Sequence, residues 1–506
     1  MFYRNYNINS ASLRDLRAFA VNSSFSSKVT RPMKTPLLNL LATLALTTAL
    51  TCGRTIPNYA AADLVLGQPD FTSSVPAITQ TGLNYASGIA IDPVTLKIFI
   101  ADKSNNRVLR YGSAAALATG AAAETVLGQA NFTTSAQPSP PTAQSMNFVS
   151  SLFMDRKGRL WVADSDNNRV LMFAAASAIG TNSSASHVYG QPDFTTASVA
   201  VSATKMNFPR GVWVDANDRL WVADSNNNRI LRFDDISNKS DGAAASGVLG
   251  QANFTTNTPG DGLAALNYPT GLAISPSGAL FVAGSYNHRV VRFDRAAALG
   301  NGANASIILG QQDFSGTAPG LSAVQMNGPH GLTVTPDDSL WVCDSYSNRL
   351  IRFSNASTKP SGAAADGIIG QPDFITNALA NTDRGLHFPF ISPCVDASGS
   401  LWVPDHNNCR VLRFPAQSSK PVLTVTTKVQ KPTTKKSILL QGKARDPNGI
   451  SRVQYKVGTG PLKTATGTTA WKLRARLKKG KNKITVIATD PWGDVSANKV
   501  IKITRK

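Results

Sequence analysis

A 14-residue segment that recurs six times at an almost constant spacing constrains the fold of this chain more than any other feature. Its clearest copy is LWVADSNNNRILRF at residues 220–233. The arginine of each copy falls at Arg107, Arg169, Arg229, Arg289, Arg349 and Arg410, at steps of 62, 60, 60, 60 and 61 residues. A regular period of this kind indicates a repeat architecture. Each copy has two nearly continuous apolar runs around a polar turn, which predicts a β-hairpin buried on both faces.

Four apolar runs make up each repeat unit. A short run opened by Gly or Pro, such as RGVWVD at residues 210–215, precedes the hairpin, and a V-L-G-Q-like run follows it. Four strands per unit, repeated around an axis, are the sequence signature of a β-propeller. The first V-L-G-Q run, at residues 65–68, comes before every hairpin, whereas the last hairpin ends at Phe414 with no such run after it. We therefore predict that the N-terminal strand completes the last unit and closes a ring of six blades, which leaves no long unpaired edge.

The repeat units resemble NHL repeats. The usual pattern of that family is Pro-x-Gly and an apolar run, then an apolar run with Val-Ala-Asp-Ser, a short turn and Asn-Arg. The segments MNFPRGVWVD at residues 206–215 and LNYPTGLAIS at residues 266–275 carry the first half, and all six copies carry the second half with some departures. The resemblance covers residues 63–414. It implies a six-bladed propeller but says little about function, because propellers host unrelated activities.

Four regions are predicted along the chain. They are a disordered leader with a secretory signal at residues 1–54, the propeller at 55–414, a linker at 415–420 and a second domain at 421–506. The signal begins at Met33, where a lysine precedes an apolar run of about a dozen residues and then small residues. A run this short does not suit a transmembrane helix, so we expect a protein that is secreted or held in the cell envelope, in the periplasm or on the outer surface. A start at Met1 or at Met33, and lipidation of Cys52, are left open by the sequence.

The second domain is predicted to be a basic β-sandwich. Alternating apolar runs separated by turns every 8 to 12 residues favour this architecture. The stretches QGKARDPNGISRVQYKV and LKKGKNKITVIATDPWG resemble the Ig-like domains appended to secreted bacterial proteins. Residues 415–506 carry 21 Lys and Arg against 3 Asp and Glu, whereas residues 61–414 carry 23 against 26. So strong a field attracts polyanions; the alternative is a solvated spacer without a partner of its own.

An aspartate and an arginine flank the hairpin turn in five of the six copies, and we interpret them as structural. A catalytic site is normally unique, whereas this pair recurs around the ring. It is therefore predicted to tie the turn and neighbouring blades together. The pairs are Asp102 with Arg107, Asp164 with Arg169, Asp224 with Arg229, Asp344 with Arg349, and Asp405 with Arg410; in the fourth copy Gly284 replaces the aspartate.

Three histidines are the candidate binding residues. His330 and His387 end connections between blades, and His406 lies in a hairpin turn, so all three are expected on one face in blades five and six. Three histidines could hold a metal ion, as in the amidating lyases related to NHL proteins, which bind a metal through histidines of different blades. Only Pro329-His330-Gly331 matches that family. We therefore predict ordinary polar positions, with no metal, no cofactor and no catalytic residue.

Taken together, these patterns predict an all-β protein with a six-bladed propeller of four-stranded blades followed by an Ig-like β-sandwich. No G-x-S-x-G elbow, phosphate-binding glycine loop or H-E-x-x-H pair occurs in the sequence. The function expected is therefore that of an exported, non-enzymatic binding or scaffold protein. It would bind a protein or carbohydrate ligand through the loop face of the propeller. The alternative is a metal-dependent propeller enzyme of the lyase or lactonase type.

Overall fold

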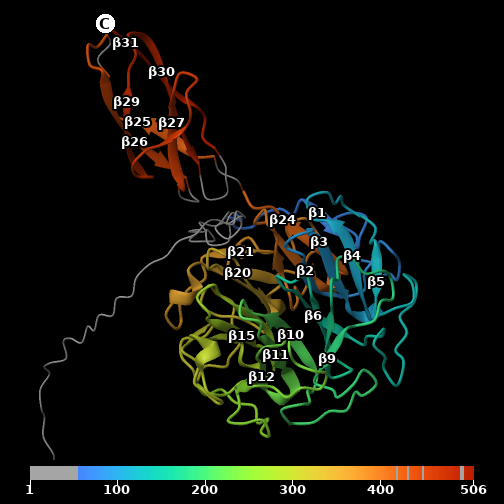
Figure 1. The fold of residues 1–506 in the computed structure, drawn as a ribbon. Coiled ribbons are helices and arrows are strands. Elements are labelled where there is room, and N and C mark those ends of the chain that lie inside the picture. The colour runs from blue at the N-terminus through green and yellow to red at the C-terminus, as the bar shows by residue number, and fades with distance from the viewer. Residues whose placement is uncertain (1–54, 418–419, 430–431, 447–449, 490–494) are drawn as a thin grey trace, which may run out of the picture. The chain divides into compact units, whose positions relative to one another are not determined.

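A computed structural model describes residues 55–506 apart from 418–419, 430–431, 447–449 and 490–494 (Figure 1). The predicted leader and secretory signal at residues 1–54, with Met33 and Cys52, lie outside the described residues. Within the described part of the chain, the structure contains no helix with the length and apolar character needed to cross a membrane.

Six four-stranded antiparallel sheets form a ring over residues 64–414, and we call them blades 1 to 6 (Figure 1). The strands of a blade are called a, b, c and d from the centre of the ring outward. The a strands of neighbouring blades contact one another around a central channel. Blade 1 consists of β2 (Ala86–Ile91), β3 (Lys97–Asp102), β4 (Arg107–Ser113) and β5 (Thr125–Leu127), blade 2 of β6 (Val149–Met154), β7 (Leu160–Asp164), β8 (Arg169–Phe173) and β9 (His187–Tyr189), and blade 3 of β10 (Pro209–Val214), β11 (Leu220–Asp224), β12 (Arg229–Phe233) and β13 (Gly247–Leu249).

Blades 4 and 5 repeat this order, and short 3₁₀ helices occupy most of the b–c turns. Blade 4 consists of β14 (Pro269–Ile274), β15 (Leu280–Gly284), β16 (Arg289–Phe293) and β17 (Ile307–Leu309), and blade 5 of β18 (Pro329–Val334), β19 (Leu340–Asp344), β20 (Arg349–Phe353) and β21 (Gly367–Ile369). The turn helices are η1 (Lys103–Asn105), η2 (Ser225–Asn227), η3 (Ser285–Asn287), η5 (Ser345–Ser347) and η7 (His406–Asn408), while η4 (Ala296–Ala298) and η6 (Ala356–Thr358) lie in c–d connections.

Blade 6 combines strands from both ends of the propeller. It contains β22 (Cys394–Val395), β23 (Leu401–Asp405) and β24 (Arg410–Phe414), and its outermost strand is β1 (Leu64–Leu66). Leu64 pairs with Arg413 and Leu66 with Val411 in an antiparallel register. On the inner side, the Ile89 amide of blade 1 donates to the Ser392 carbonyl of blade 6 over 2.9 Å. The predicted closure of the ring by the N-terminal strand is thereby confirmed.

The a strands approach one another so closely that three of them need glycine at their third position. A Cβ atom on Gly211, Gly271 or Gly331 would overlap with a backbone carbonyl oxygen of the next blade. The pairing of strands a and b also shifts register at this point. The glycine of the Pro-x-Gly pattern therefore serves backbone contact between blades.

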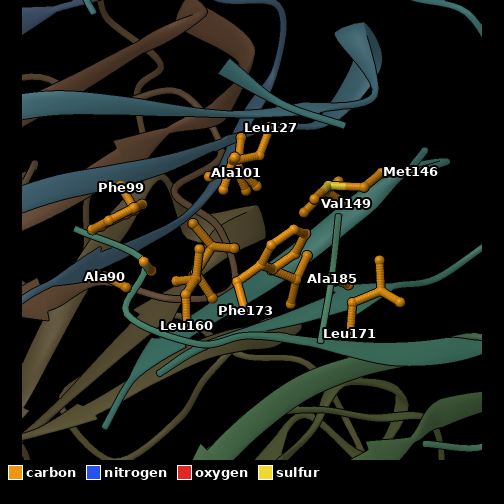
Figure 2. Packing of buried hydrophobic residues seen from close by; sticks show 14 of the residues in the cluster. Ala90, Phe99, Ala101, Leu127, Met146, Val149, Leu160, Leu171, Phe173 and Ala185 are labelled. Carbon is orange, nitrogen blue, oxygen red and sulfur yellow. The ribbon is translucent and has the colours of Figure 1, made fainter. Parts of the chain in front are cut away.

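Apolar side chains fill the space between successive blades. Figure 2 shows one such layer, where Phe99, Ala101 and Leu127 of blade 1 pack near Leu160 and Phe173 of blade 2. The strand b tryptophans are buried in equivalent layers: Trp161, Trp221, Trp341 and Trp402 are at most 3% exposed. Burial of this surface is the main favourable term in holding the blades together.

The recurring aspartate and arginine form buried ion pairs that join two consecutive d–a connections. Arg229 Nε lies 2.7 Å from Asp224 Oδ2, and both side chains are 0% exposed. Arg229 also donates to the carbonyls of Ser202 (2.7 Å), before its blade, and Phe254 (2.6 Å), after it. The Asn207 amide donates to the other aspartate oxygen over 2.7 Å. The same 2.7 Å ion pair occurs in Asp102–Arg107, Asp164–Arg169, Asp344–Arg349 and Asp405–Arg410.

Blade 4 has no aspartate at this position, so adding one there tests how much the ion pair contributes to stability. Arg289 is buried, and it donates to the carbonyls of Phe314 and Asp261 but belongs to no ion pair recorded among the described residues. Gly284 has φ −93°, which any residue tolerates, and a Cβ there would meet Arg289 O at an ordinary 3.6 Å. Gly284→Asp is therefore expected to stabilise the propeller by about 1–3 kcal/mol in chemical denaturation. Gly300→Asp, at an exposed site with open space around it, is the control; an equal change in both would contradict the prediction.

The described residues of the C-terminal domain form seven strands in two sheets, as the predicted β-sandwich requires. Buried Leu440, Val453, Trp471, Ile484 and Val486 belong to its core. One sheet has the order β25 (Val422–Val425), β26 (Ser437–Arg445), β29 (Ala470–Arg476), and the other has β28 (Lys463–Thr464), β27 (Arg452–Val457), β30 (Gly480–Thr489), β31 (Lys499–Arg505).

Candidate functional site

The two ends of the propeller channel differ in what they offer a ligand. At the end formed by the a–b turns lies a cavity of 780 Å³ lined by residues that include Phe153 and Trp213. A carboxylate of that cavity is already engaged, since Asp155 accepts from Arg159 Nε at 2.5 Å and from Trp161 Nε1 at 2.9 Å. The other end, which we call the loop face, is formed by the d–a connections and the b–c turns. Buried side chains without ion partners gather on this loop face.

An aromatic residue directly precedes strand a in blades 1 to 4, and Phe388 stands six residues before strand a of blade 6. These residues share a left-handed backbone, with φ between 50° and 59°, at Tyr85, Phe148, Phe208, Tyr268 and Phe388. A side-chain acceptor from the preceding blade holds most of these backbones; for example, the Phe208 amide donates to Asn168 Oδ1 over 2.9 Å. Left-handed aromatic residues are uncommon, and such backbone strain gathers at functional sites.

Two further tyrosines come from the b–c turns of blades 4 and 5. Tyr286 stacks on Tyr268 with ring centroids 4.6 Å apart and an interplanar angle of 9°. In blade 5 the position before strand a is Gly328 instead of an aromatic residue. A Cβ atom on Gly328 would overlap with the ring of Tyr346, so Tyr346 supplies the aromatic ring of this blade. Tyr286 is 58% exposed, Tyr346 54% and Tyr85 41%. We call this set of seven rings the aromatic crown: Tyr85, Phe148, Phe208, Tyr268, Tyr286, Tyr346 and Phe388.

Beneath the crown, four buried side chains from four blades meet around the buried ring of Phe390. The ring of Phe390 lies 4.4 Å from the ring of His406 and 5.1 Å from the ring of His330. Lys103 Nζ lies 4.8 Å and Arg210 Cζ 5.5 Å from the same ring centroid. We call these residues the cationic floor: Lys103, Arg210, His330, Phe390 and His406, each between 3% and 9% exposed.

Lys103 occupies a turn position that holds a serine in blades 2 to 5. In blade 1 another residue makes the contact with the next blade that this serine makes elsewhere. At the start of the b–c turn, Ser165 donates to the Pro209 carbonyl of the next blade over 2.6 Å, and the corresponding serines of blades 3 to 5 do the same. In blade 1, Ser87 of strand a donates to the Val149 carbonyl over 2.7 Å instead. The turn position is thus free to carry Lys103.

The structure brings two of the three candidate histidines together. His406 Nδ1 donates to the Ala86 carbonyl (2.8 Å), and His330 Nδ1 to the Gly328 carbonyl (2.8 Å). Burial and nearby cations lower the pKa of His330 to about 3 and that of His406 well below its usual value, so both rings are neutral at pH 7. His387 does not join them, because its Nε2 faces Asn407 Nδ2 at 3.2 Å. No group of three or more His, Cys, Asp or Glu residues suited to a metal ion occurs in the described part of the chain.

Two positive charges define the electrostatics of the floor. Burial, and then the charge of Arg210, lowers the pKa of Lys103 to about 7. Burial also lowers the pKa of Arg210, whose Nε is buried without a hydrogen-bond partner. Asp166 is the carboxylate that favours the charged form of Lys103. Neither cation, however, belongs to an ion pair found within the described ranges, and each instead faces aromatic rings.

Family comparisons agree with the repeat pattern and with the second domain. The model described as NHL repeat matches residues 206–233, 266–293 and 326–353, and the model described as bacterial Ig domain matches residues 421–486. The chain contains NHL repeats and a bacterial Ig-like domain. No curated protein matches the sequence.

Solved structures with similarity to this NHL-repeat chain include proteins of different kinds. A gluconolactonase from Xanthomonas campestris is 14% identical over 72% of this chain and 98% of its own, with a TM-score of 0.41. Virginiamycin B lyase from Staphylococcus aureus is 14% identical over 65% of this chain and 94% of its own, with a TM-score of 0.38. A chain of a nidogen/laminin complex is 17% identical over 56% of this chain and 83% of its own, with a TM-score of 0.34.

The crown and the two cations of the NHL propeller were not identified from the sequence, although signals for them are present. The residue after each Leu-Asn or Met-Asn pair is Tyr or Phe in blades 1 to 4, and Phe388 follows Leu-His in blade 6. Lys103 stands where four repeats have serine, and Arg210 stands two residues after the crown position. Departures from a repeat often mark a functional site, and Lys103 is such a departure.

Proposed function

We propose that this protein is an exported binding protein whose propeller binds a carbohydrate at the aromatic crown. The observation that supports this best is the crown itself: seven rings, three of them more than 40% exposed, surround a floor of buried polar side chains. Exposed tyrosines combine a flat apolar face with a hydroxyl group, which suits them to binding interfaces. The site therefore offers stacking surfaces at its rim and hydrogen-bonding groups at its centre.

Amide side chains favour a carbohydrate over a protein as the ligand. An asparagine precedes the crown position in five blades, and each is only partly buried: Asn84, Asn147, Asn207, Asn267 and Asn327. Asn147 Oδ1 is buried without a hydrogen-bond partner. Rings that alternate with amides match the two surfaces of a sugar, whose apolar C–H face stacks on rings while its hydroxyl groups exchange hydrogen bonds with amides.

Tyr346→Ala provides the test of this function. Binding of the full chain to a panel of immobilised oligosaccharides and peptides identifies the ligand class, and Tyr346→Ala is expected to weaken that binding at least about tenfold, as truncation of a central aromatic residue does at binding sites. Val94→Ala is the control, since Val94 is 82% exposed in the a–b turn at the opposite end. Equal binding by both variants would place the binding site elsewhere. One equivalent of metal per chain that is lost in His330→Ala would favour the metal-dependent enzyme instead.

For the C-terminal domain we propose contact with a polyanion. Alternation along β29 leaves Lys472, Arg474 and Arg476 exposed on one face of its sheet. On the second sheet, Lys483 lies directly opposite Lys502. Like charges that face each other across two strands are destabilising, so a negatively charged partner would relieve their repulsion.

A heparin column tests the contact with a polyanion. The full chain is expected to bind at low salt and to elute as salt rises, because screening weakens attraction between exposed charges. A chain that ends at Phe414 is expected to flow through. Equal retention of the two proteins would contradict a contact made by the C-terminal domain.

A further inference from the structure

We infer that the ligand of the aromatic crown carries a carboxylate on a sugar ring, as a uronic acid does, and that Lys103 and Arg210 bind this carboxylate. The inference rests on the proposed function and specifies the chemical class of the sugar. It follows from three features of the site: two buried cations that belong to no ion pair among the described residues, two neutral histidines whose Nε2 can only accept, and the rings above them.

Neither cation belongs to an ion pair recorded among the described residues, and Asp166, which favours the charged form of Lys103, forms no salt bridge with either of them there. Lys103 is 8% exposed and Arg210 9% exposed, and the positive charge of Arg210 disfavours the protonated form of Lys103. An isolated buried charge is unfavourable unless it is paired. Phe148, at 4.0 Å from Lys103 Nζ, offsets part of this cost through a cation–π contact, but it supplies no hydrogen bond.

A carboxylate would satisfy the donors that the floor leaves unused. The hydrogen-bond acceptor recorded for Lys103 Nζ among the described residues is His406 Nε2, at a long 3.5 Å. The Nε group of Arg210 has no hydrogen-bond partner among the described residues, while its guanidinium group also has a side-chain hydrogen bond with Tyr268. A carboxylate accepts hydrogen bonds from ammonium and guanidinium groups, and such charge-assisted bonds are about twice as strong as neutral ones.

The histidines add acceptors for hydroxyl groups, which distinguishes a sugar acid from a simple anion. A carbonyl oxygen cannot donate, so the bonds from His406 Nδ1 to Ala86 O and from His330 Nδ1 to Gly328 O place the ring proton on Nδ1. Nε2 of each neutral ring is then an acceptor. Nε2 of His406 has Lys103 Nζ as its donor at a long 3.5 Å. A phosphate that lacks hydroxyl groups would add no donor to either acceptor, whereas the hydroxyl groups of a uronic acid can donate to them.

Glucuronate and glucose form a matched pair of probes, because they differ only in having a carboxylate or a hydroxymethyl group at one carbon. In calorimetric titration of the full chain, D-glucuronate is expected to bind at least about tenfold more tightly than D-glucose. Lys103→Met and Arg210→Lys should each remove most of this preference, whereas Lys97→Met, which removes a partly exposed lysine paired with Glu124, should keep it. Without ligand, Lys103→Met should raise the melting temperature, since it relieves the repulsion between two buried cations.

The possible results separate this inference from the proposed function. Equal binding of the two sugars, or a preference for glucuronate that survives in both Lys103→Met and Arg210→Lys, overturns the carboxylate site while leaving a sugar-binding crown. Failure of glucuronate to bind also overturns it. Tighter binding of a short peptide through its terminal carboxylate overturns both the uronic acid and the carbohydrate proposal. If Tyr346→Ala binds sugars as tightly as the unchanged protein, the crown is not the binding site, for charged and for neutral sugars alike.

Discussion

Deletion of residues 1–68 is expected to lower the melting temperature of the propeller by more than about 10 °C, because it removes the outer strand of blade 6. Leu64, Val65 and Leu66 are at most 2% exposed. Burial of each such side chain contributes roughly 1.5–3 kcal/mol, and the loss also leaves the edge of β24 without its partner. In a repeat fold, stability depends on contacts between neighbours, so the damage extends to the blades that flank the gap.

Deletion of residues 1–54 is the matched control for this experiment. The protein without residues 1–54 keeps β1 and should have the same melting temperature as the full chain. Differential scanning calorimetry of the two truncated proteins therefore isolates the contribution of residues 55–68. If both melt together, the ring does not depend on the N-terminal strand.

Arg229→Met should destabilise the propeller by about 3–5 kcal/mol, the usual effect of removing one partner of a buried ion pair. The methionine leaves Asp224, which is 0% exposed, with hydrogen bonds from the Asn207 amide and from Asn227 Nδ2 but no positive charge. Three carbonyls, of Ser202, Lys205 and Phe254, also lose this donor. Chemical denaturation at pH 7 measures the loss.

Three comparisons test the cause of that loss. Arg219→Met removes a partly exposed arginine of the same blade and should cost less than about 1 kcal/mol. Asp224→Asn in the Arg229→Met background should restore part of the stability, because no uncompensated charge remains. Burial already raises the pKa of Asp224, and loss of Arg229 raises it further, so the native state binds the extra proton. The stability of Arg229→Met should therefore recover as the pH falls from 7 toward 5, a recovery that Asp224→Asn abolishes.

The fold could be predicted because its information is local and repeated. The hairpin turns lie within single repeat units, and the period and the displaced first V-L-G-Q run become visible when the units are compared; together they indicated six blades and their closure. The buried aspartate and arginine repeat in the same way, and Asp224 and Arg229 face each other across one hairpin.

The candidate site could not be predicted to the same extent, because it forms only when distant blades converge. Lys103, Arg210 and Phe390 belong to blades 1, 3 and 6, and no spacing in the sequence relates them. The sequence did place His330 and His406 on one face. It could not show that His387 would turn to Asn407, because that contact depends on the conformation of a turn.

The pairing of β1 with β24 also determines the order in which the chain can fold. Arg413 of β24 donates to Asp63, the residue just before β1, across a separation of 350 residues, whereas the hairpins of blades 1 to 5 connect neighbours in sequence. Local hairpins can form early, but a contact across so long a loop carries a large entropic cost and slows folding. β1, the first strand of the described residues, is therefore expected to pair among the last, when the other strands of the ring have already formed and one edge of blade 6 is still open.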